Sequence, residues 1–556
     1  MATVHTDAPA IFSTFAINEA EDDIKFVKVE PVLSTNKNST ISFEIPGKSS
    51  RYTDLRNSYI QMRVHVEETD AFSKSKPDQA PEYFNVQTLP FANAQDSFIA
   101  QLTNQEKEEE RSPPGPGAKR RKRDGSAQEE SITYQKLKEM QELSFRVYLK
   151  ALKTQERADA AKEANNPAAE DLQSVAQGEM LHAEELCKQY FKMKLAYTQQ
   201  ADVIKSIIPI DNIFHSMWSD VEIHMNNSKV NDSNRLYMYK AYIETLLNNS
   251  NSTKIFQLQS LGYYGDTGNK DEFYGYTYND GMSKRHQKFA GNRVNELTGY
   301  LLDDVMGVSA AIVNAVRTVI KLIPNYENIR LQTFGKNVFG KIVIDDIYMM
   351  VCQRKMADEV LLAHNEIMQK KPASYPFKKA EMAIFHGKKG DHSIKVTNPY
   401  ESKIPTRLIV GMVNASAHAG DFSKNPLRFQ HYNVKKAGFY IDNESACKPP
   451  YELSPSQGLY MAPYLELFSI LGKFGEDQDM GLTPENFLEG NFLLPFDVVP
   501  TAAGNLDYIA KKDGGTCSLE IYFSEPLPED IYVLTYGVFP YVLEIDAARN
   551  VFAHPL

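Results

Sequence analysis

The chain has 556 residues, a hydrophobic content of 42% and a formal net charge of −11. This length exceeds what one hydrophobic core normally holds and indicates two or three domains. The acidic balance excludes nucleic-acid binding by the surface as a whole, so any such contact has to be local.

The four cysteines are scattered without a CxxC pair. This spacing excludes a disulfide framework and a cysteine-rich zinc site, and it indicates a reducing compartment. The first residues form neither a basic nor an apolar leader region, which argues against secretion. The most apolar run, 308–323, is interrupted by Arg317 and Lys321. It is too short and too polar to span a bilayer, so we expect no membrane partner.

The N-terminal part of the chain predicts an arm followed by strands. Residues 1–23 lack strand patterning and predict a loose arm. Apolar and polar residues then alternate at 24–29, 40–45 and 60–66, a pattern typical of half-buried antiparallel strands. These segments predict that 24–69 begins a β-sandwich.

Strand patterning is lost between 70 and 203, where the sequence predicts a charged, Pro-rich and helical insertion. Residues 112–117 are Ser, Pro and Gly only, which favours an exposed loop. One predicted helix presents apolar residues at spacings of three and four, namely Leu137, Met140, Leu143, Val147 and Ala151. A second predicted helix, at about 168–198, follows the break at Asn165-Asn166-Pro167. Together they predict an αα-hairpin.

A short motif occurs twice and predicts a duplication. The first copy is Leu236-Tyr237-Met238 with Tyr242 and Glu244; the second is Leu459-Tyr460-Met461 with Tyr464 and Glu466. Matching strands precede each copy, at 221–225 and 437–441, and further upstream at 59–66 and 407–413. A fixed order of like elements indicates a repeated unit. Tyr59 and Leu236 are 177 residues apart, whereas Arg407 and Leu459 are 52 apart. The 125 extra residues locate the insertion in the first unit.

The remaining strands complete two tandem units. Strand patterning resumes at 204 and continues to 356, a helical connector follows at 357–371, and the second unit with its C-terminal tail occupies 372–556. Many short strands separated by turn residues predict an all-β fold of two tandem eight-stranded jelly-roll sandwiches. We expect the two sandwiches to stand side by side, with each motif helix in the loop after the fourth strand.

No catalytic, metal or cofactor site is expected. Neither GxxxxGK[ST] nor GxSxG occurs. His182 with Glu184 and Glu185 does not form HExxH. His386 and His392 flank a basic loop and lack the HxH pattern of a cupin. The pairs Asp303-Asp304 and Asp345-Asp346 would point to opposite faces of a strand unless a bulge intervened.

Several segments resemble the double jelly-roll major capsid proteins of Polinton (Maverick) elements and their adintovirus-like relatives. In the second half these are 404–411, 424–433, 464–468, 495–497, 541–546 and 549–551. In the first half, 210–218 and 239–247 resemble the same family. The resemblance covers about 36–66 and 204–551, and the insertion has no counterpart in the family pattern.

The resemblance implies a structural protein and not an enzyme, without a cofactor. It implies homotrimers that form pseudo-hexagonal capsomers and tile an icosahedral shell around double-stranded DNA. The implied partners are further copies of the chain, penton and minor capsid proteins, and non-specific contacts with packaged DNA. The implied location is the virion capsid, with assembly in the host nucleus after cytoplasmic synthesis. The alternatives are a jelly-roll carbohydrate- or ligand-binding module and a cupin-like metalloenzyme.

One dense basic run lies in the insertion: Lys119, Arg120, Arg121, Lys122 and Arg123. It is a candidate nuclear-import signal or DNA contact, and the alternative is a solvated charge run. With 40–45 and 59–66 taken as strands B and C, the insertion falls in the C–D loop. It would then lie opposite a D–E loop carrying the helix at 236–247. In the resembled family this arrangement implies that the insertion projects toward the capsid interior, with the basic run near the genome.

Overall fold

The computed structural model describes residues 21–32, 39–68, parts of 143–186, 206–498 with short gaps (at 232, 268, 272–278, 335–338, 447 and 476–479), and 515–556. The described residues form two compact units. One contains the described parts of 21–68, 206–271 and 279–556, and the other contains those of 143–186.

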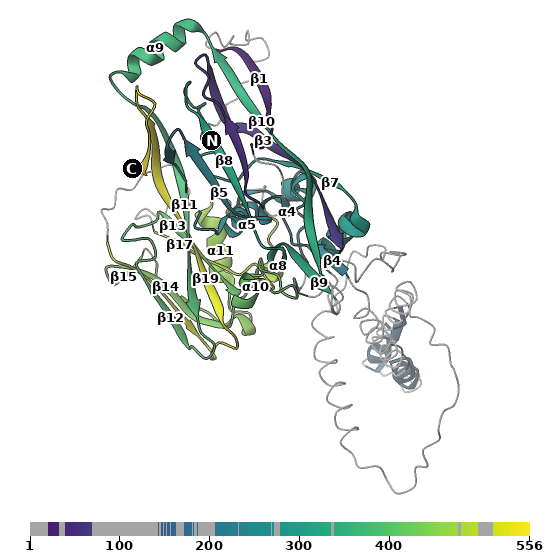
Figure 1. The fold of residues 1–556 in the computed structure, drawn as a ribbon. Coiled ribbons are helices and arrows are strands. Elements are labelled where there is room, and N and C mark those ends of the chain that lie inside the picture. Colours follow the sequence, from purple (N-terminus) through teal and green to yellow (C-terminus); the bar gives the residue numbers. More distant parts are fainter. Residues whose placement is uncertain are drawn as a thin grey trace, which may run out of the picture. The chain divides into compact units, whose positions relative to one another are not determined.

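The first sandwich consists of two four-stranded antiparallel sheets, β1-β10-β3-β7 and β2-β8-β5-β6 (Figure 1). Alternating side chains build its core: in Ile41–Ile45, the three apolar residues are buried and the two polar ones are partly exposed. The strands are β1 (Glu21–Val29), β2 (Ile41–Ile45), β3 (Arg51–Glu68), β5 (Trp218–Met225), β6 (Ser228–Lys229), β7 (Asn295–Gly299), β8 (Thr318–Pro324) and β10 (Gly340–Met356). A separate pair joins β4 (Ser206–Pro209) to β9 (Leu331–Phe334).

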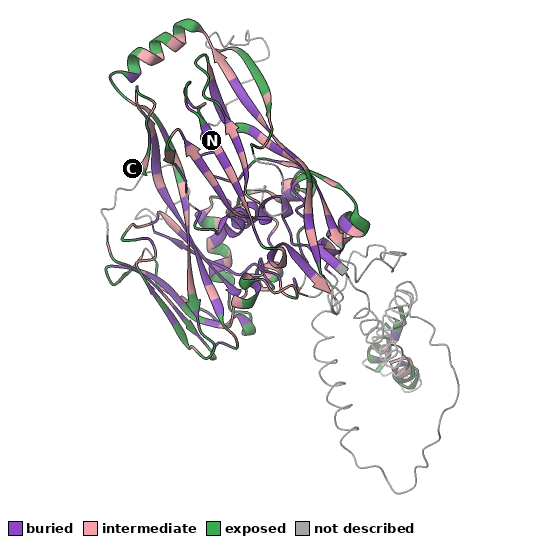
Figure 2. Cartoon of the chain, in the orientation of Figure 1, coloured by how far each residue is buried: buried purple, intermediate pink, exposed green. Residues whose placement is uncertain are grey.

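The second sandwich repeats this arrangement, with sheets β11-β19-β13-β17 and β12-β18-β14-β15. Its strands are β11 (Ala373–Gly387), β12 (Ser393–Thr397), β13 (Arg407–Asn414), β14 (Val434–Ile441), β15 (Glu444–Ser445), β17 (Leu493–Asp497), β18 (Cys517–Phe523) and β19 (Ile531–Ile545). Two short strands, β16 (Tyr451–Glu452) and β20 (Val551–Pro555), pair with β14 and β19. Buried residues recur along the strands of both sandwiches (Figure 2).

The two sandwiches have the same topology. Numbered one to eight along the chain, the main strands of each form sheets in the order 1-8-3-6 and 2-7-4-5. Eight strands in two sheets with these crossovers form a jelly roll. The predicted all-β fold of two eight-stranded jelly-roll sandwiches is therefore confirmed.

Helices occupy matching positions between the fifth and sixth main strands. In the first sandwich α5 (Tyr237–Asn248) follows β6, and in the second α11 (Met461–Ile470) follows β15. Helix α9 (Asp358–Met368) joins the two sandwiches, between β10 and β11 (Figure 1). The shorter helices are α4 (Ile213–Ser216), α6 (Asn251–Phe256), α7 (Asp280–Phe289), α8 (Glu327–Arg330), α10 (Ala415–Ala419) and α12 (Pro484–Leu488).

The predicted strand lettering is wrong. Strand β1 pairs with β10, which is the last main strand of the first sandwich in the sequence. Strand β1 is therefore the first strand of the roll. Residues 41–45 and 51–68 are consequently the second and third strands, C and D. The helix of the motif follows the fifth strand, because the two-residue strand β6 precedes it. Such a long-range partner and so short a strand leave no clear pattern in the sequence.

This correction moves the insertion to the connection between the third and fourth strands. In a sandwich whose strands run up and down, successive connections alternate between the two ends. The third-to-fourth and fifth-to-sixth connections therefore lie at the same end, and not at opposite ends. We expected the insertion to project toward a capsid interior because we placed it at the end opposite the motif helix. The corrected strand order no longer supports that expectation.

The described residues of the insertion are helical between 143 and 162 and between 172 and 186. The two helical stretches meet at Glu179, whose carboxylate accepts a hydrogen bond from Thr154 at 2.6 Å and pairs with Lys150 at 2.8 Å. Of the predicted apolar stripe, Leu137 and Met140 lie outside the described residues. Leu143 is exposed, whereas small residues such as Ala151 and Ala176 are buried. The buried residues among those described in these helices are all alanines.

Candidate functional site: the seam between the two sandwiches

The second sandwich is covered on the outer face of its sheet β11-β19-β13-β17 by helix α5 of the first. The ring of Tyr239 stacks on His418, with centroids 5.6 Å apart, and its hydroxyl lies 3.0 Å from the His418 Nδ1. The rings of Tyr242 and Phe429 pack together, with their centroids 6.2 Å apart. Every residue of β13 after Arg407 is buried, whereas burial in the equivalent strand β3 alternates from residue 58 to 66. We call this contact between the sandwiches the seam.

Gly411 lets the ring of Phe429 lie close against β13 at this seam. A Cβ atom at Gly411 would stand 2.6 Å from the Phe429 ring, closer than side-chain atoms approach in proteins. The absence of a side chain therefore creates the space for the ring on which Tyr242 packs.

A buried charged cluster lies at the centre of the seam. Lys240 of α5 is buried; its Nζ lies 2.8 Å from Asp304 Oδ2 and 3.9 Å from Glu244 Oε1. The second sandwich completes the cluster. The Ala380 amide of β11 donates to Asp304 at 2.9 Å, and the Tyr536 hydroxyl of β19 donates to Glu244 at 3.1 Å.

Burial and charge act in opposite directions on this cluster. Burial alone lowers the pKa of Lys240, but the carboxylates of Asp304 and Glu244 outweigh it and hold that pKa well above its ordinary value. Burial raises the pKa of Glu244 to about 7, against the opposing effect of Lys240, and it also raises the pKa of Asp304. Lys240 therefore stays charged, and Glu244 takes up a proton near neutral pH.

A second lysine crosses the seam. The buried ammonium of Lys270 donates to the Tyr242 hydroxyl of its own sandwich at 3.0 Å. From the second sandwich it meets the carbonyl oxygens of Leu427 and Gly490, both at 3.0 Å, and Asn491 Oδ1 at 2.8 Å. Burial lowers the pKa of Lys270 to about 8. These four oxygens compensate for the water that the ammonium loses.

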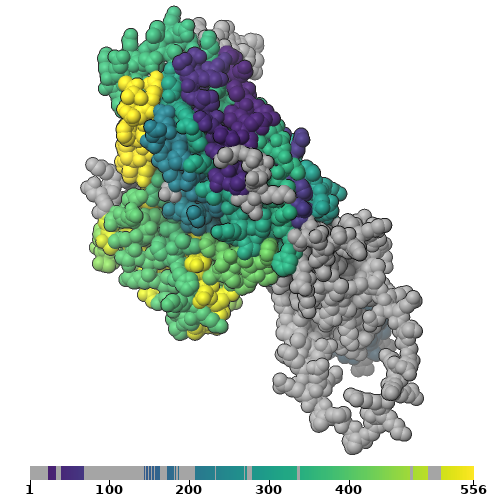
Figure 3. All heavy atoms as spheres, viewed as in Figure 1, coloured from purple at the N-terminus to yellow at the C-terminus, as the bar shows by residue number. Residues whose placement is uncertain are grey.

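The C-terminal turn forms a third tie. The guanidinium of Arg549 donates to the Asn314 carbonyl oxygen at 2.9 Å, to Asn314 Oδ1 at 2.6 Å and to Asn365 Oδ1 of α9 at 2.9 Å. The Asn226 side chain donates to the Arg549 carbonyl oxygen at 2.6 Å. Figure 3 shows the yellow C-terminal segment beside the blue-teal part of the first sandwich. The end of the chain is thereby fastened to the first sandwich and to the connecting helix.

A further buried ion pair lies inside the first sandwich. Arg285 of α7 contacts Asp266 at 2.9 Å and Asp211 at 3.5 Å, and it donates to the carbonyl oxygens of Pro209 and Tyr264 at 2.9 Å each. Burial raises the pKa of Asp211 to about 7, while Arg285 opposes the shift. The cluster fixes the loop before α4, and it does not reach the second sandwich through any of these contacts.

The structure separates the residues that the sequence singled out. Lys119, Arg120, Arg121, Lys122 and Arg123 lie outside the described residues, as do Glu184 and Glu185 beside the exposed His182. His386 of β11 packs against Tyr532, with ring centroids 5.4 Å apart, and His392 is exposed in the turn after that strand.

The two pairs of aspartates also differ from expectation. Asp303 and Asp304 lie in a turn and not in a strand; Asp303 accepts a hydrogen bond from Asn231 at 2.7 Å, and Asp304 joins the seam. In β10 a register shift does fall between Ile344 and Asp346, and Asp345 bonds His65 at 2.8 Å. Each pair is thus engaged with other side chains.

Within the described residues, no group of three His, Cys, Asp or Glu side chains could hold a metal ion. The same part of the chain contains no helix long and apolar enough to cross a membrane.

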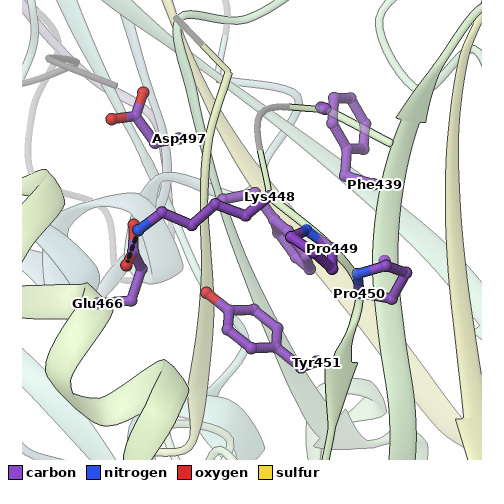
Figure 4. A pocket seen from close by; sticks show the side chains of 10 residues that line it. Phe439, Lys448, Pro449, Pro450, Tyr451, Glu466 and Asp497 are labelled. Atoms are coloured by element: carbon purple, nitrogen blue, oxygen red, sulfur yellow. Dashed lines mark hydrogen bonds and ion pairs between the residues drawn. The ribbon is translucent and has the colours of Figure 1, made fainter. Parts of the chain in front are cut away.

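A small pocket lies beside α11 in the second sandwich (Figure 4). Its walls include Phe439, Pro450 and Tyr451, and Lys448 forms an ion pair with Glu466 of α11 beside them. The Tyr451 hydroxyl donates to the Pro495 carbonyl oxygen at 2.6 Å. The Lys448–Glu466 pair thus links α11 to the segment before β16, and Tyr451 bonds the backbone of β17.

Sequence reasoning missed the seam. Asp304 was singled out only as half of an acidic pair, and Arg549 only as part of a resembling segment. No local pattern distinguishes Lys240 or Lys270 from a solvated lysine. One signal was present: Lys240 and Glu244 stand four residues apart in a helix that is otherwise almost wholly apolar and aromatic.

Comparisons with known proteins support the fold. No protein-family model matches the chain. An uncharacterized protein of Caenorhabditis elegans, F54H12.2, is 23% identical over 354 residues, which cover 62% of this chain and 80% of that protein.

Solved structures give a longer match. A chain in the cryo-EM structure of the Sputnik virophage matches with a TM-score of 0.50 and 9% identity, over 100% of this chain and 93% of that one. The Faustovirus major capsid protein matches with a TM-score of 0.46 and 7% identity, over 96% and 93%. The strand order and the match to the Sputnik chain agree with the predicted fold, which is a double jelly roll.

Proposed function

We propose that this chain is a structural major capsid protein of a Polinton-like double-stranded DNA virus or element. It acts without catalytic turnover, as a homotrimer that forms a pseudo-hexagonal capsomer in an icosahedral shell. The proposal is supported by the double jelly roll, by the resembling segments and by the likeness to a chain in the structure of the Sputnik virophage.

The observation that carries the proposal is the pairing of two sandwiches of the same topology across a buried seam. Lys270 and Arg549 bond the other sandwich directly, and the two carboxyls that flank Lys240 accept hydrogen bonds from it. A chain built in this way presents two similar units in one fixed relation. Three such chains supply six similar units, and closed cyclic symmetry then requires one flank of each chain to meet the other flank of the next.

The wider partners follow from the same proposal. Penton and minor capsid proteins would complete the shell, and the mature protein would reside in the virion capsid. We propose that Lys119, Arg120, Arg121, Lys122 and Arg123 direct import, so that assembly takes place in the host nucleus. Non-specific contact of this run with packaged DNA is the second proposed role.

Expression of the chain in eukaryotic cells tests both the capsid proposal and the proposed role of the basic run. Shells or trimeric capsomers recovered by sedimentation and seen by electron microscopy would support the capsid proposal; a monomer that never assembles would refute it. Replacement of the five basic residues by Ser should leave the purified protein able to form trimers and should abolish its nuclear accumulation. Unchanged nuclear accumulation would exclude the import role alone.

A further inference from the structure

The two copies of the duplicated helix differ sharply in exposure. When the two copies of the motif are aligned on their Tyr-x-Glu residues, Tyr239 corresponds to Met461 and Ile243 to Leu465. Tyr239 and Ile243 are 1% and 2% exposed, whereas Met461 and Leu465 are 50% and 51% exposed. The same helix position is thus covered in the first sandwich and uncovered in the second.

The uncovered face of α11 is apolar. The helix MAPYLELFSI has a single charged residue, Glu466, which is held by Lys448. A helix that is apolar around most of its circumference is normally buried. The exposed residues Leu459 and Phe474, one on each side of the helix in sequence, extend the same surface. We call these four exposed side chains the α11 stripe: Leu459, Met461, Leu465 and Phe474.

The contacts of α5 show which kind of surface such a helix covers. Tyr239, Tyr242 and Glu244 reach His418, Phe429 and Tyr536, over the outer face of the sheet with strand order 1-8-3-6 in the second sandwich. That sheet has one topological counterpart among the described residues, namely β1-β10-β3-β7 of the first sandwich.

The counterpart sheet carries an uncovered aromatic face. Ile24 and Phe26 of β1 are exposed, as is Tyr300 just after β7, and Tyr59 of β3 is partly exposed between them. The ring centroids of Phe26 and Tyr59 are 6.2 Å apart, and those of Tyr59 and Tyr300 are 6.1 Å apart. We call these four residues the aromatic face. Exposed apolar patches of this kind mark interaction surfaces.

We propose that the α11 stripe of one chain docks on the aromatic face of a second copy, and so repeats between chains the contact that α5 makes within the chain. This inference rests on the proposed function, because a closed ring of three chains supplies one such contact at each junction. The contact is heterologous, since the stripe and the face lie on different sandwiches. Around the trimer, the seam within each chain therefore alternates with this contact between neighbouring chains.

A charge placed in the stripe tests the contact. In Leu465→Glu, a carboxylate would be buried against aromatic rings without a partner. We expect the trimer dissociation constant to rise by at least about tenfold, because removing a charge from water without a partner is costly. Leu362→Glu is the matched control: Leu362 of α9 is 64% exposed and lies outside the stripe, so the trimer should persist. Both positions are solvent-exposed in the single chain, so both variants should fold, which circular dichroism checks.

A photo-crosslinker at position 465 gives a second measurement that does not depend on destabilisation. After irradiation, trimers of the chain that carries the crosslinker should yield cross-linked peptides. These peptides should contain Ile24, Phe26, Tyr59 or Tyr300 of another copy. Cross-links to a different surface, or a Leu465→Glu trimer as tight as the control, would overturn this inference while the capsid proposal stands. A wild-type chain that stays monomeric would overturn both.

Discussion

Removing the lysine at the centre of the seam should destabilise the protein strongly. In Lys240→Met the side chain keeps its length but loses the ammonium that lies 2.8 Å from Asp304 and 3.9 Å from Glu244. The two carboxyls would remain buried beneath the second sandwich. Removing one partner of a buried ion pair typically costs about 3–5 kcal/mol, because the other charge is left without compensation.

An exposed ion pair provides the control for this prediction. Lys284 pairs with Asp280 at 2.5 Å four residues along α7, and both side chains are solvent-exposed in part. Lys284→Met should therefore cost less than about 1 kcal/mol. The contrast between the two variants separates the effect of burial from that of an ion pair as such.

The single tryptophan makes the measurement direct. Trp218 is fully buried at the start of β5, so its fluorescence reports unfolding of the first sandwich in urea. All variants should be compared at one protein concentration, since assembly shifts apparent stability. At pH 5 the loss in Lys240→Met should shrink, because Glu244, whose pKa is raised to about 7, is then neutral. A loss below about 1 kcal/mol at pH 7, or an equal loss at both pH values, would refute the role assigned to Lys240.

Three further predictions concern the seam. Because burial raises the pKa of Glu244 from 4.5 to about 7, the folded protein holds a proton that the unfolded chain releases in this window. Wild-type stability should therefore fall relative to Glu244→Gln as the pH rises from 4.5 to 7, by on the order of 3 kcal/mol in urea titrations; parallel curves would contradict this. Gly411→Ala should lower the melting temperature because its Cβ meets Phe429, whereas Gly178→Ala, with nothing within 4 Å, should not; equal melting temperatures would count against the packing at β13. Arg549→Ala should speed hydrogen exchange in α9, through loss of the bond to Asn365, while exchange in β14 stays unchanged; unaltered exchange in α9 would show that the C-terminal turn does not fasten the helix.

Much of the architecture could be predicted because it is repeated. The motif around Tyr242 and Tyr464 matched strands that are matched in the structure, and alternation in segments such as 41–45 identified the inward faces. The connecting helix was expected between the sandwiches, and α9 lies there. Periodicity and repetition are local or pairwise signals, and they survive in a single sequence.

What could not be predicted depends on contacts between distant segments. Strand β1 is the first strand of the roll only because it pairs with β10, more than 300 residues away. The two residues of β6 are too few to show a pattern. Lys240 becomes a seam residue only when Ala380 and Tyr536 of the second sandwich close over its partners. The exposure of Leu465 is likewise invisible in a motif whose first copy is buried.

A cryo-electron microscopy reconstruction of the purified chain tests most directly whether the protein forms trimeric capsomers. We expect closed particles of three chains with six sandwich densities in a ring. In this ring the intramolecular seam alternates with the contact between the α11 stripe and the aromatic face. Particles containing one or two chains, or open filaments in which the contacts do not close, would contradict it.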